Sequence, residues 1–340
     1  AALTSVLLGD QSQDIALANV TGTVTVPGIE TINVSTSLLA SKLVDLEIDA
    51  AKLLTITGDK NLTITAAVNF FDNASGVAGA IDGVVDASAF TGKLNFTADA
   101  DEMDIRGGTA NDTINMVATL DGYDKIDGGD GTDTLTMNAA ALGTQFAQTT
   151  NIEALTFNPS TGDQAVNLAK VPASITTVTS NNSDSTDDTA SETVTFSNHT
   201  TQLIGVKHTV ADAGTDGNGD GANITVTGAV DTAADEVSVK LFSTGGISGG
   251  TGGKGVAVLN VASYETVNIE SDGTVGGTTS NTVNTLTATK ASTVNITGDG
   301  KLTVSATGLP SVGTVTIDAS GLAAALVMTT GTITGDYTLG

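Results

Sequence analysis

The 340-residue chain contains no cysteine and no tryptophan, and it has only four prolines. Without thiols it can form neither disulfides nor thiolate metal sites, and it has no cysteine nucleophile. Aromatic residues make up only 3% of the sequence, so a bulky globular core is not expected. The abundant β-branched and small residues instead favour stacked strands. For an exported protein, bound calcium could supply the cross-links that disulfides would otherwise provide.

Positive charge is also scarce, because 12 Lys and Arg stand against 38 Asp and Glu, for a formal net charge of -26. This balance disfavours nucleic acids and anionic membranes as partners and makes divalent cations the natural counter-ions. The chain has no run of about 18 apolar residues and no charged-then-apolar N-terminal segment. We therefore expect neither a membrane span nor a secretory signal here, and Ala1 can be the start of a fragment.

Residues 128–136 read Gly-Gly-Asp-Gly-Thr-Asp-Thr-Leu-Thr, a complete calcium-binding nonapeptide of the form Gly-Gly-x-Gly-x-Asp-x-apolar-x. The paired glycines allow a tight turn that brings backbone carbonyls to a cation, and Asp133 supplies a carboxylate. Leu135 then points into a core. The motif predicts a β-roll turn built around calcium.

Two imperfect copies precede this motif. Asp133 follows Asp124 by nine residues and Leu135 follows Ile126 by nine, so these two copies are predicted to be tandem turns whose carboxylates face each other across a narrow coil. Asp112 stands twelve residues before Asp124, and for Asp112 a solvated turn stays open as an alternative. The predicted calcium ligands of this region are Gly107, Asn111, Asp112, Gly122, Asp124, Asp127, Gly128, Asp130, Gly131 and Asp133.

A second metal candidate is the loop that places Asp216, Asn218 and Asp220 at alternating positions, with Gly221 at the sixth. Thr227 occupies the position where a bidentate Glu would close an EF-hand, so an EF-hand is excluded. A calcium loop of another type and a solvated turn both remain open.

Apolar residues alternate with Thr or Asn along much of the chain, which is the pattern of strands with one buried face. Long helices are scarce, and residues 37–54 are ambiguous between helix and strand. The alternating segments are residues 31–35, 54–57, 62–65, 94–97, 154–157, 193–196, 224–227, 294–297 and 315–317.

An internal repeat organises these segments. Residues 51–64 return as residues 291–304, and two further landmarks flank both copies in the same order: 30–34 with 265–269, and 85–89 with 317–321. We therefore predict an all-β fold of elongated, stacked β-modules, resembling a β-solenoid or β-sandwich, with a short calcium β-roll. The predicted divisions are a first module at 1–105, the β-roll at 106–137, a second module with acidic and Gly-rich loops at 138–256, and a third at 257–340 that stops before calcium turns of its own.

Candidate catalytic groups are few. His199 and His208 are the only histidines, and neither has a zinc-ligand spacing or a nucleophile elbow nearby. Adjacent carboxylates such as Asp187 and Asp188 are better explained as solvated loops in so acidic a chain. The chain is therefore predicted not to be an enzyme, and a secreted hydrolase would need a constellation that the sequence does not display.

The order of an Ile-Glu-Thr-Ile-Asn-Val strand, an Ile-Thr-Gly-Asp turn, an Asp-Ala-Ser segment and the nonapeptide resembles the RTX-type surface-layer (S-layer) proteins of Gram-negative bacteria. The resemblance covers most of residues 20–160 and 257–340. It implies an extracellular, calcium-dependent lattice protein that is exported by a type I system and assembles with itself. It also implies attachment to lipopolysaccharide through a separate N-terminal region, but neither that region nor an export tail is evident here. The nonapeptide alone would equally fit RTX toxins, proteases and lipases, and a calcium-stiffened RTX adhesin remains the main alternative.

Overall fold

The structure is a computed structural model that describes residues 10–71, 79–99, 102–116, 120–138, 144–158, 163–182, 193–208, 222–242, 256–273, 280–311, 313–331 and 334–338. This part of the chain consists of strands β1 to β28 and one short 3-10 turn, η1 (Leu168–Lys170). The prediction of an all-β chain is therefore confirmed.

The chain divides into two compact units. The first comprises Ala1–Met137 and Gly143–Leu155, and the second comprises Asn138–Leu142 and Thr156–Gly340. The predicted division at residues 105 and 106 falls inside β9 (Met103–Arg106), so the predicted β-roll continues the preceding coils without a break in the strands.

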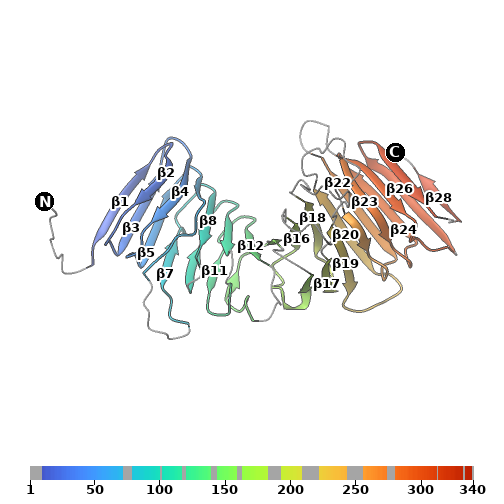
Figure 1. Cartoon of the computed structure of the whole chain (residues 1–340), viewed down its shortest axis with the longest axis horizontal. Helices are drawn as coiled ribbons and strands as arrows, with labels where there is room; N and C mark the ends of the chain where they lie inside the picture. Colours follow the sequence, from blue (N-terminus) through green and yellow to red (C-terminus); the bar gives the residue numbers. More distant parts are fainter. Residues whose placement is uncertain are drawn as a thin grey trace, which may run out of the picture. The chain divides into compact units, whose positions relative to one another are not determined.

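In the first unit, the odd-numbered strands form a parallel sheet in the order β1-β3-β5-β7-β9-β11-β13, and the even-numbered strands β2 to β12 follow one another in a second sheet (Figure 1). The strands are β1 (Ser12–Leu17), β2 (Thr21–Thr25), β3 (Thr31–Thr36), β4 (Ser41–Glu47), β5 (Leu53–Gly58), β6 (Leu62–Ile64), β7 (Gly83–Asp86), β8 (Leu94–Ala98), β9, β10 (Thr113–Met116), β11 (Lys125–Asp127), β12 (Thr134–Asn138) and β13 (Thr149–Thr150).

The second unit repeats this arrangement with a sheet of odd-numbered strands, β15 to β27, and with even-numbered strands β16 to β28 in order. The unit boundary lies inside β14 (Ala154–Asn158). The other strands are β15 (Gln164–Asn167), β16 (Thr177–Asn182), β17 (Thr193–His199), β18 (Leu203–His208), β19 (Ala222–Gly228), β20 (Glu236–Phe242), β21 (Val256–Asn260), β22 (Thr266–Asp272), β23 (Ser280–Thr287), β24 (Thr293–Gly298), β25 (Lys301–Ala306), β26 (Thr314–Leu322), β27 (Leu326–Thr330) and β28 (Thr334–Thr338).

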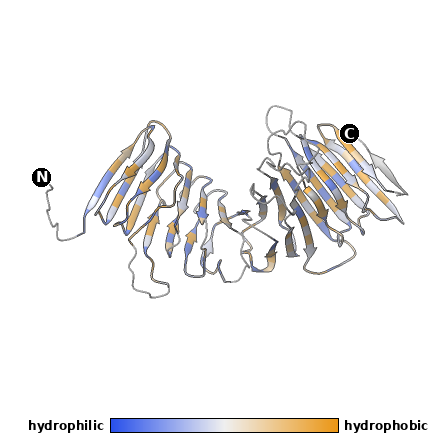
Figure 2. Cartoon of the chain, in the orientation of Figure 1, coloured by the Kyte–Doolittle hydropathy of each residue, from blue (hydrophilic) through white to orange (hydrophobic). Residues whose placement is uncertain are grey.

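Within each unit, each coil thus contributes one strand to each of two sheets, and each strand pairs in parallel with the next strand of the same sheet, two further along the chain. This is the topology of a β-solenoid. Its core is built from in-register columns of apolar residues that lie on the inner face of every coil. One such column runs through Ile32, Leu54, Val85, Ile105 and Ile126, all buried. Figure 2 shows the resulting alternation of hydrophobic and hydrophilic residues along the strands.

The alternating segments of the sequence coincide with β3, β5, β6, β8, β14, β17, β19, β24 and β26, except that Thr65 lies just past the end of β6. The ambiguous residues 37–54 contain β4 and the start of β5, with no helix. The alternation of apolar and polar residues was therefore a better guide to this stretch than its helix-favouring content of Leu, Ala, Lys and Glu. A buried face at every second residue suits only a strand.

The internal repeat has equivalent local structure in both copies. Residues 51–64 form β5 and β6, and residues 291–304 form β24 and β25. Gly58 and Gly298, at equivalent positions, have φ of +112° and +110°. A Cβ at either position would lie 2.2 Å or 2.1 Å from a carbonyl oxygen of the neighbouring coil, so both turns require glycine.

Candidate metal centre

Two of the three nonapeptide-like turns stack on one edge of the first unit. The turn at residues 107–112 connects β9 with β10, and the turn at residues 128–133 connects β11 with β12. Since β9 pairs with β11 and β10 pairs with β12, with Thr113 opposite Thr134, Asp112 and Asp133 precede paired strands in adjacent coils. They are 21 residues apart, which is the length of one coil here.

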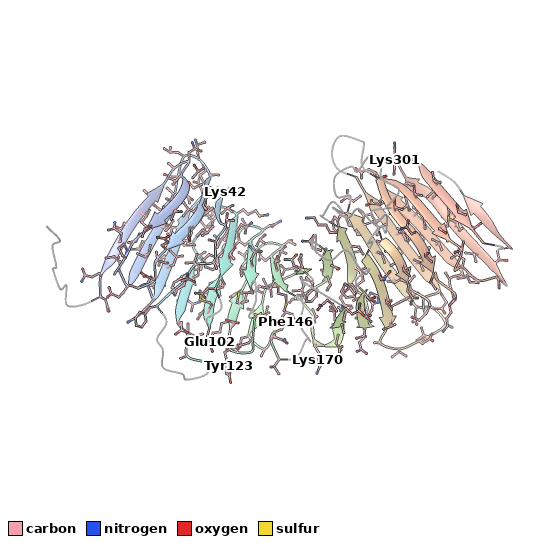
Figure 3. All side chains as sticks on the ribbon, in the orientation of Figure 1. Lys42, Glu102, Tyr123, Phe146, Lys170 and Lys301 are labelled. Carbon is pink, nitrogen blue, oxygen red and sulfur yellow. The ribbon has the colours of Figure 1, made fainter. Side chains whose placement is uncertain are left out.

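Asp124 lies on the opposite edge, because it precedes β11 and follows β10. The labels of Tyr123 and Lys42, which belong to the two edges, are at opposite ends of the coils in Figure 3. The structure therefore differs from the expectation that Asp124 and Asp133 face each other. Nine residues carry the chain from one sheet to the other, so the stacked neighbour of Asp133 is Asp112.

All three aspartates are buried, and one carboxylate oxygen of each accepts a hydrogen bond from a backbone N–H of the preceding coil. The donors to Asp112 Oδ1, Asp124 Oδ1 and Asp133 Oδ1 are the N–H groups of Leu94 (2.8 Å), Met103 (3.0 Å) and Asp112 (2.6 Å). The carboxylates thus satisfy backbone donors where consecutive coils meet. The side chain of Asp112 is itself buried, although Thr109 and Asn111 of the same turn are exposed.

The second carboxylate oxygen distinguishes Asp133 from the other two. Asp112 Oδ2 accepts the N–H of Gly108 at 2.7 Å, and Asp124 Oδ2 accepts the N–H of Asp121 at 2.9 Å. Asp133 Oδ2 is buried and has no hydrogen-bond partner among the described residues. A buried, unpaired carboxylate oxygen is unfavourable unless a cation or a proton compensates it.

Burial raises the pKa of all three carboxyl groups. For Asp133 the pKa rises to about 7, because the negative charges of Asp112, Glu153 and Asp127 add to the effect of burial and outweigh the hydrogen bond from the Asp112 N–H. Four carboxylates therefore interact unfavourably at this turn when all are ionised.

Glycine allows the two turns to stack this closely. Gly129 has φ of +91°, and a Cβ there would lie 2.1 Å from the carbonyl oxygen of Gly108 in the turn below. A Cβ on Gly128 would lie 2.7 Å from Asp133 Oδ2. The paired glycines therefore keep the backbone close to the unpaired oxygen.

The other predicted ligands have different surroundings. Asn111 Oδ1 accepts the N–H of Thr132 at 3.0 Å, and Asp127 Oδ1 accepts the N–H of Gly129 at 3.2 Å. Both residues therefore support the stacked turns. Gly107 belongs to the lower turn, Asp130 and Gly131 are exposed, and Gly122 lies with Asp124 on the opposite edge. Asp216, Asn218 and Asp220 lie outside the described residues.

Glu153 was not predicted as part of this site. Its Oε2 accepts the N–H of Asp133 at 2.8 Å, so it caps Asp133 as Asp133 caps Asp112. Glu153 follows Asp133 by 20 residues, close to the 21 between Asp112 and Asp133. A search at the coil length would have found it, whereas the nonapeptide period of nine could not.

The atoms at the Asp133 turn that could be metal ligands are carboxylate and carbonyl oxygens, which suit calcium chemically. Among the residues that the structure describes, no three or more His, Cys, Asp or Glu side chains are grouped closely enough to hold a metal. Asp112 and Asp124 already have both oxygens hydrogen-bonded to backbone amides. Of these three aspartates, only Asp133 therefore has a buried oxygen, Oδ2, without a hydrogen-bond partner among the described residues.

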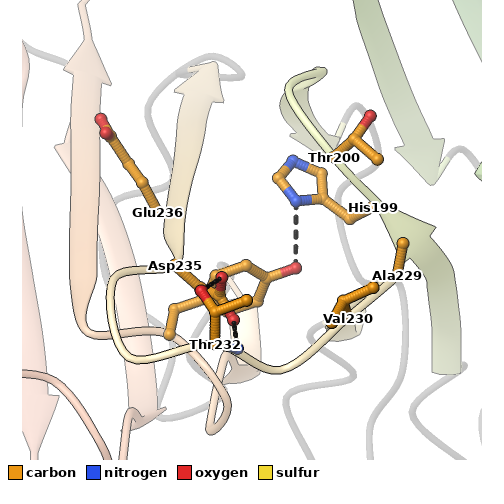
Figure 4. Close-up of a pocket in the computed structure, with 8 residues that line it drawn as sticks. His199, Thr200, Ala229, Val230, Thr232, Asp235 and Glu236 are labelled. Carbon is orange, nitrogen blue, oxygen red and sulfur yellow. Dashed lines mark hydrogen bonds between the residues drawn. The ribbon is translucent and has the colours of Figure 1, made fainter.

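A separate pocket of about 200 Å³ lies in the second unit, and the residues that line it include His199, Tyr264, Thr232 and Asp235 (Figure 4). His199 Nε2 lies 2.9 Å from the carbonyl oxygen of Gln202, which can only accept, so Nε2 carries the proton. His199 Nδ1 must then accept from the hydroxyl of Tyr264, 3.0 Å away. Burial lowers the pKa of His199. Both ring nitrogens of His199 are therefore engaged in hydrogen bonds.

The chain matches no family model, no curated protein and no solved structure. In the described part of the chain, no helix combines the length and the apolar character needed to cross a lipid bilayer.

Proposed function

We propose that this chain is a structural protein that assembles with itself into a calcium-dependent, two-dimensional S-layer on the surface of a Gram-negative bacterium. Export by a type I system and a location outside the cell belong to the same proposal. The resemblance described above supports it, together with the acidic composition and the solenoid fold.

The observation that carries the proposal is the unpaired Oδ2 of Asp133. This oxygen is buried between stacked glycine turns and faces the charge of three further carboxylates, with a net charge of -26 on the whole chain. Above about pH 7, where the Asp133 carboxyl is ionised, a bound cation would compensate this buried charge.

The residues of the turn have separate roles in this proposal. Asp133 Oδ2 would bind calcium, and Asp127 and Glu153 would add charge while they hold the backbone of the turn through their hydrogen bonds. Bound calcium would supply positive charge at this edge, and the oxygen atoms of the turn would be its ligands. The coils would then stack in one register and present a defined surface to neighbouring chains.

The test is a titration of the purified chain with calcium and with sodium at matched ionic strength, followed by light scattering and negative-stain microscopy. Sodium only screens the repulsion between the negatively charged chains, over about 8 Å at physiological ionic strength. We expect calcium to drive sheet formation at concentrations too low for screening to matter, and a chelator to reverse it. A chain that stays monomeric at millimolar calcium would contradict the proposal and favour the adhesin alternative.

A further inference from the structure

Three large aliphatic side chains are exposed close together in the sequence of the first unit. Leu38 is 78% exposed and Leu39 is 57% exposed, both in the turn between β3 and β4, and Val44 on β4 is 58% exposed. We call Leu38 and Leu39 the aliphatic tip. Single exposed aliphatic residues are common, whereas two adjacent leucines in one turn expose a larger continuous apolar area.

The backbone of the tip is strained. Leu38 has φ of +64°, and the N–H of Leu39 donates to the carbonyl oxygen of Ser37 at 2.7 Å. A hydrogen bond from residue i+2 to residue i around a positive φ defines the rare γ-turn. A branched side chain is unfavourable in this conformation, where Gly or Asn would be tolerated. A strained turn that holds a leucine in solvent indicates a role in binding.

Lysines follow the tip along the same edge. Lys42 is exposed at the start of β4, and Lys60 and Lys93 lie in the equivalent turns of the next two coils. The N–H of Ser41 donates to Asn61, and the N–H of Leu62 donates to Lys93, so these turns are stacked. Lys60 pairs with Asp59, whereas Lys42 and Lys93 have no ion pair among the described residues.

We propose that the aliphatic tip and the adjacent lysines form a docking surface for a second copy of this chain, and this inference rests on the proposed self-assembly. Charge complementarity selects the partner. Acidic residues outnumber basic ones 38 to 12 over the whole chain, whereas Lys42, Lys60 and Lys93 lie at stacked turns on the edge that carries the aliphatic tip. The contact joins this edge to an acidic surface of the neighbour, so it is heterologous and can continue from chain to chain.

The test compares the wild-type chain with the double variant Leu38→Gly/Leu39→Ser, by light scattering against protein concentration in calcium. Glycine accepts the positive φ at residue 38, so the variant removes the side chains without straining the turn. Val230→Ser is the matched control, because Val230 is 69% exposed in the other unit. We expect the tip variant to need at least 10-fold more protein to assemble, Lys42→Glu to weaken assembly as well, and the control to behave as wild type.

Measuring calcium binding by calorimetry, together with assembly by light scattering, separates this inference from the proposed function. If wild type assembles and the tip variant assembles equally well, the docking surface is wrong and the proposed function stands. If the wild type does not assemble at all, the proposed function is contradicted, and so is this inference, which rests on it. Flotation with phosphatidylcholine vesicles that requires Leu38, without any effect on assembly, would identify a lipid surface as the partner and overturn the inference.

Discussion

Asp112 and Asp133 occupy the same position of the same motif, one coil apart, yet their energetic situations differ. The N–H groups of Leu94 and Gly108 satisfy both oxygens of Asp112. Asp133 has one oxygen without a partner and carboxylates around it. A single unmade hydrogen bond thus distinguishes a structural cap from a candidate metal ligand.

Replacement of Asp133 by Ala should weaken calcium binding at least tenfold, because it removes the only buried carboxylate oxygen of the stacked turns that has no other partner. Asp49→Ala removes the same charge from an exposed position and is the control. Isothermal titration calorimetry measures both. Equal losses would mean that overall acidity governs binding.

The pH dependence of stability without calcium should be unusual for an acid-rich chain. Burial raises the pKa of Asp133 from an ordinary 3.8 to about 7. The folded state therefore holds this proton more tightly than the unfolded state. Its stabilising contribution is complete below about pH 4 and is lost as the pH rises through about 7. In a chelator, the stability of the first unit should fall over this interval by about 1 to 3 kcal/mol.

Urea denaturation at several pH values measures this loss. The Asp133→Asn variant should show a smaller fall, because it keeps the acceptor for the Asp112 N–H but cannot ionise. The same slope in wild type and variant would show that Asp133 does not titrate as described.

The sequence was informative about this site only in part. The glycine and aspartate pattern locates the turns and the residue with the unpaired oxygen. It could not reveal that Asp124 belongs to the other edge, because edge membership depends on how many strands complete a coil. Glu153 lies outside the motif altogether, and its role as a cap depends on stacking between coils. The binding of calcium itself stays a prediction.

At the scale of elements, the stacked turns depend on close backbone approach. Gly129→Ala should destabilise the first unit by about 3 kcal/mol or more, since the methyl group would meet the Gly108 carbonyl in a left-handed conformation. Gly28→Ala is the control, because Gly28 also has positive φ but no heavy atom within 4 Å of the new Cβ. It should cost only about 1 to 2 kcal/mol.

Urea midpoints of the two variants give the comparison. Similar losses would indicate that the positive φ alone, and not the contact with Gly108, makes glycine necessary at position 129.

Strand positions were largely predictable, whereas sheet membership was not. Alternation specifies which residues of a strand face the core, and Ile32, Leu54 and Ile296, apolar members of three alternating segments, are buried. It carries no information on which sheet a strand joins. The first repeat places residues 53–58 in an odd-numbered strand, and the second places the equivalent residues 293–298 in an even-numbered one. The same local segment therefore serves in either sheet.

At the scale of the whole molecule, calcium should order one region more than others. Hydrogen exchange should slow in calcium across β10, β11 and β12, which flank the Asp133 turn, and change little in β22 and β24. Mass spectrometry of peptides with and without chelator makes the measurement. A uniform change along the chain would point to an effect of ionic strength.

Cryo-electron microscopy of the full chain, in calcium and in chelator, shows whether calcium bound at Asp133 accompanies assembly into a sheet. We expect an ordered two-dimensional sheet in calcium, with density for an ion beside Asp133, and dispersed chains in chelator. Dispersed single chains under both conditions, or a sheet that persists in chelator without that density, would contradict it.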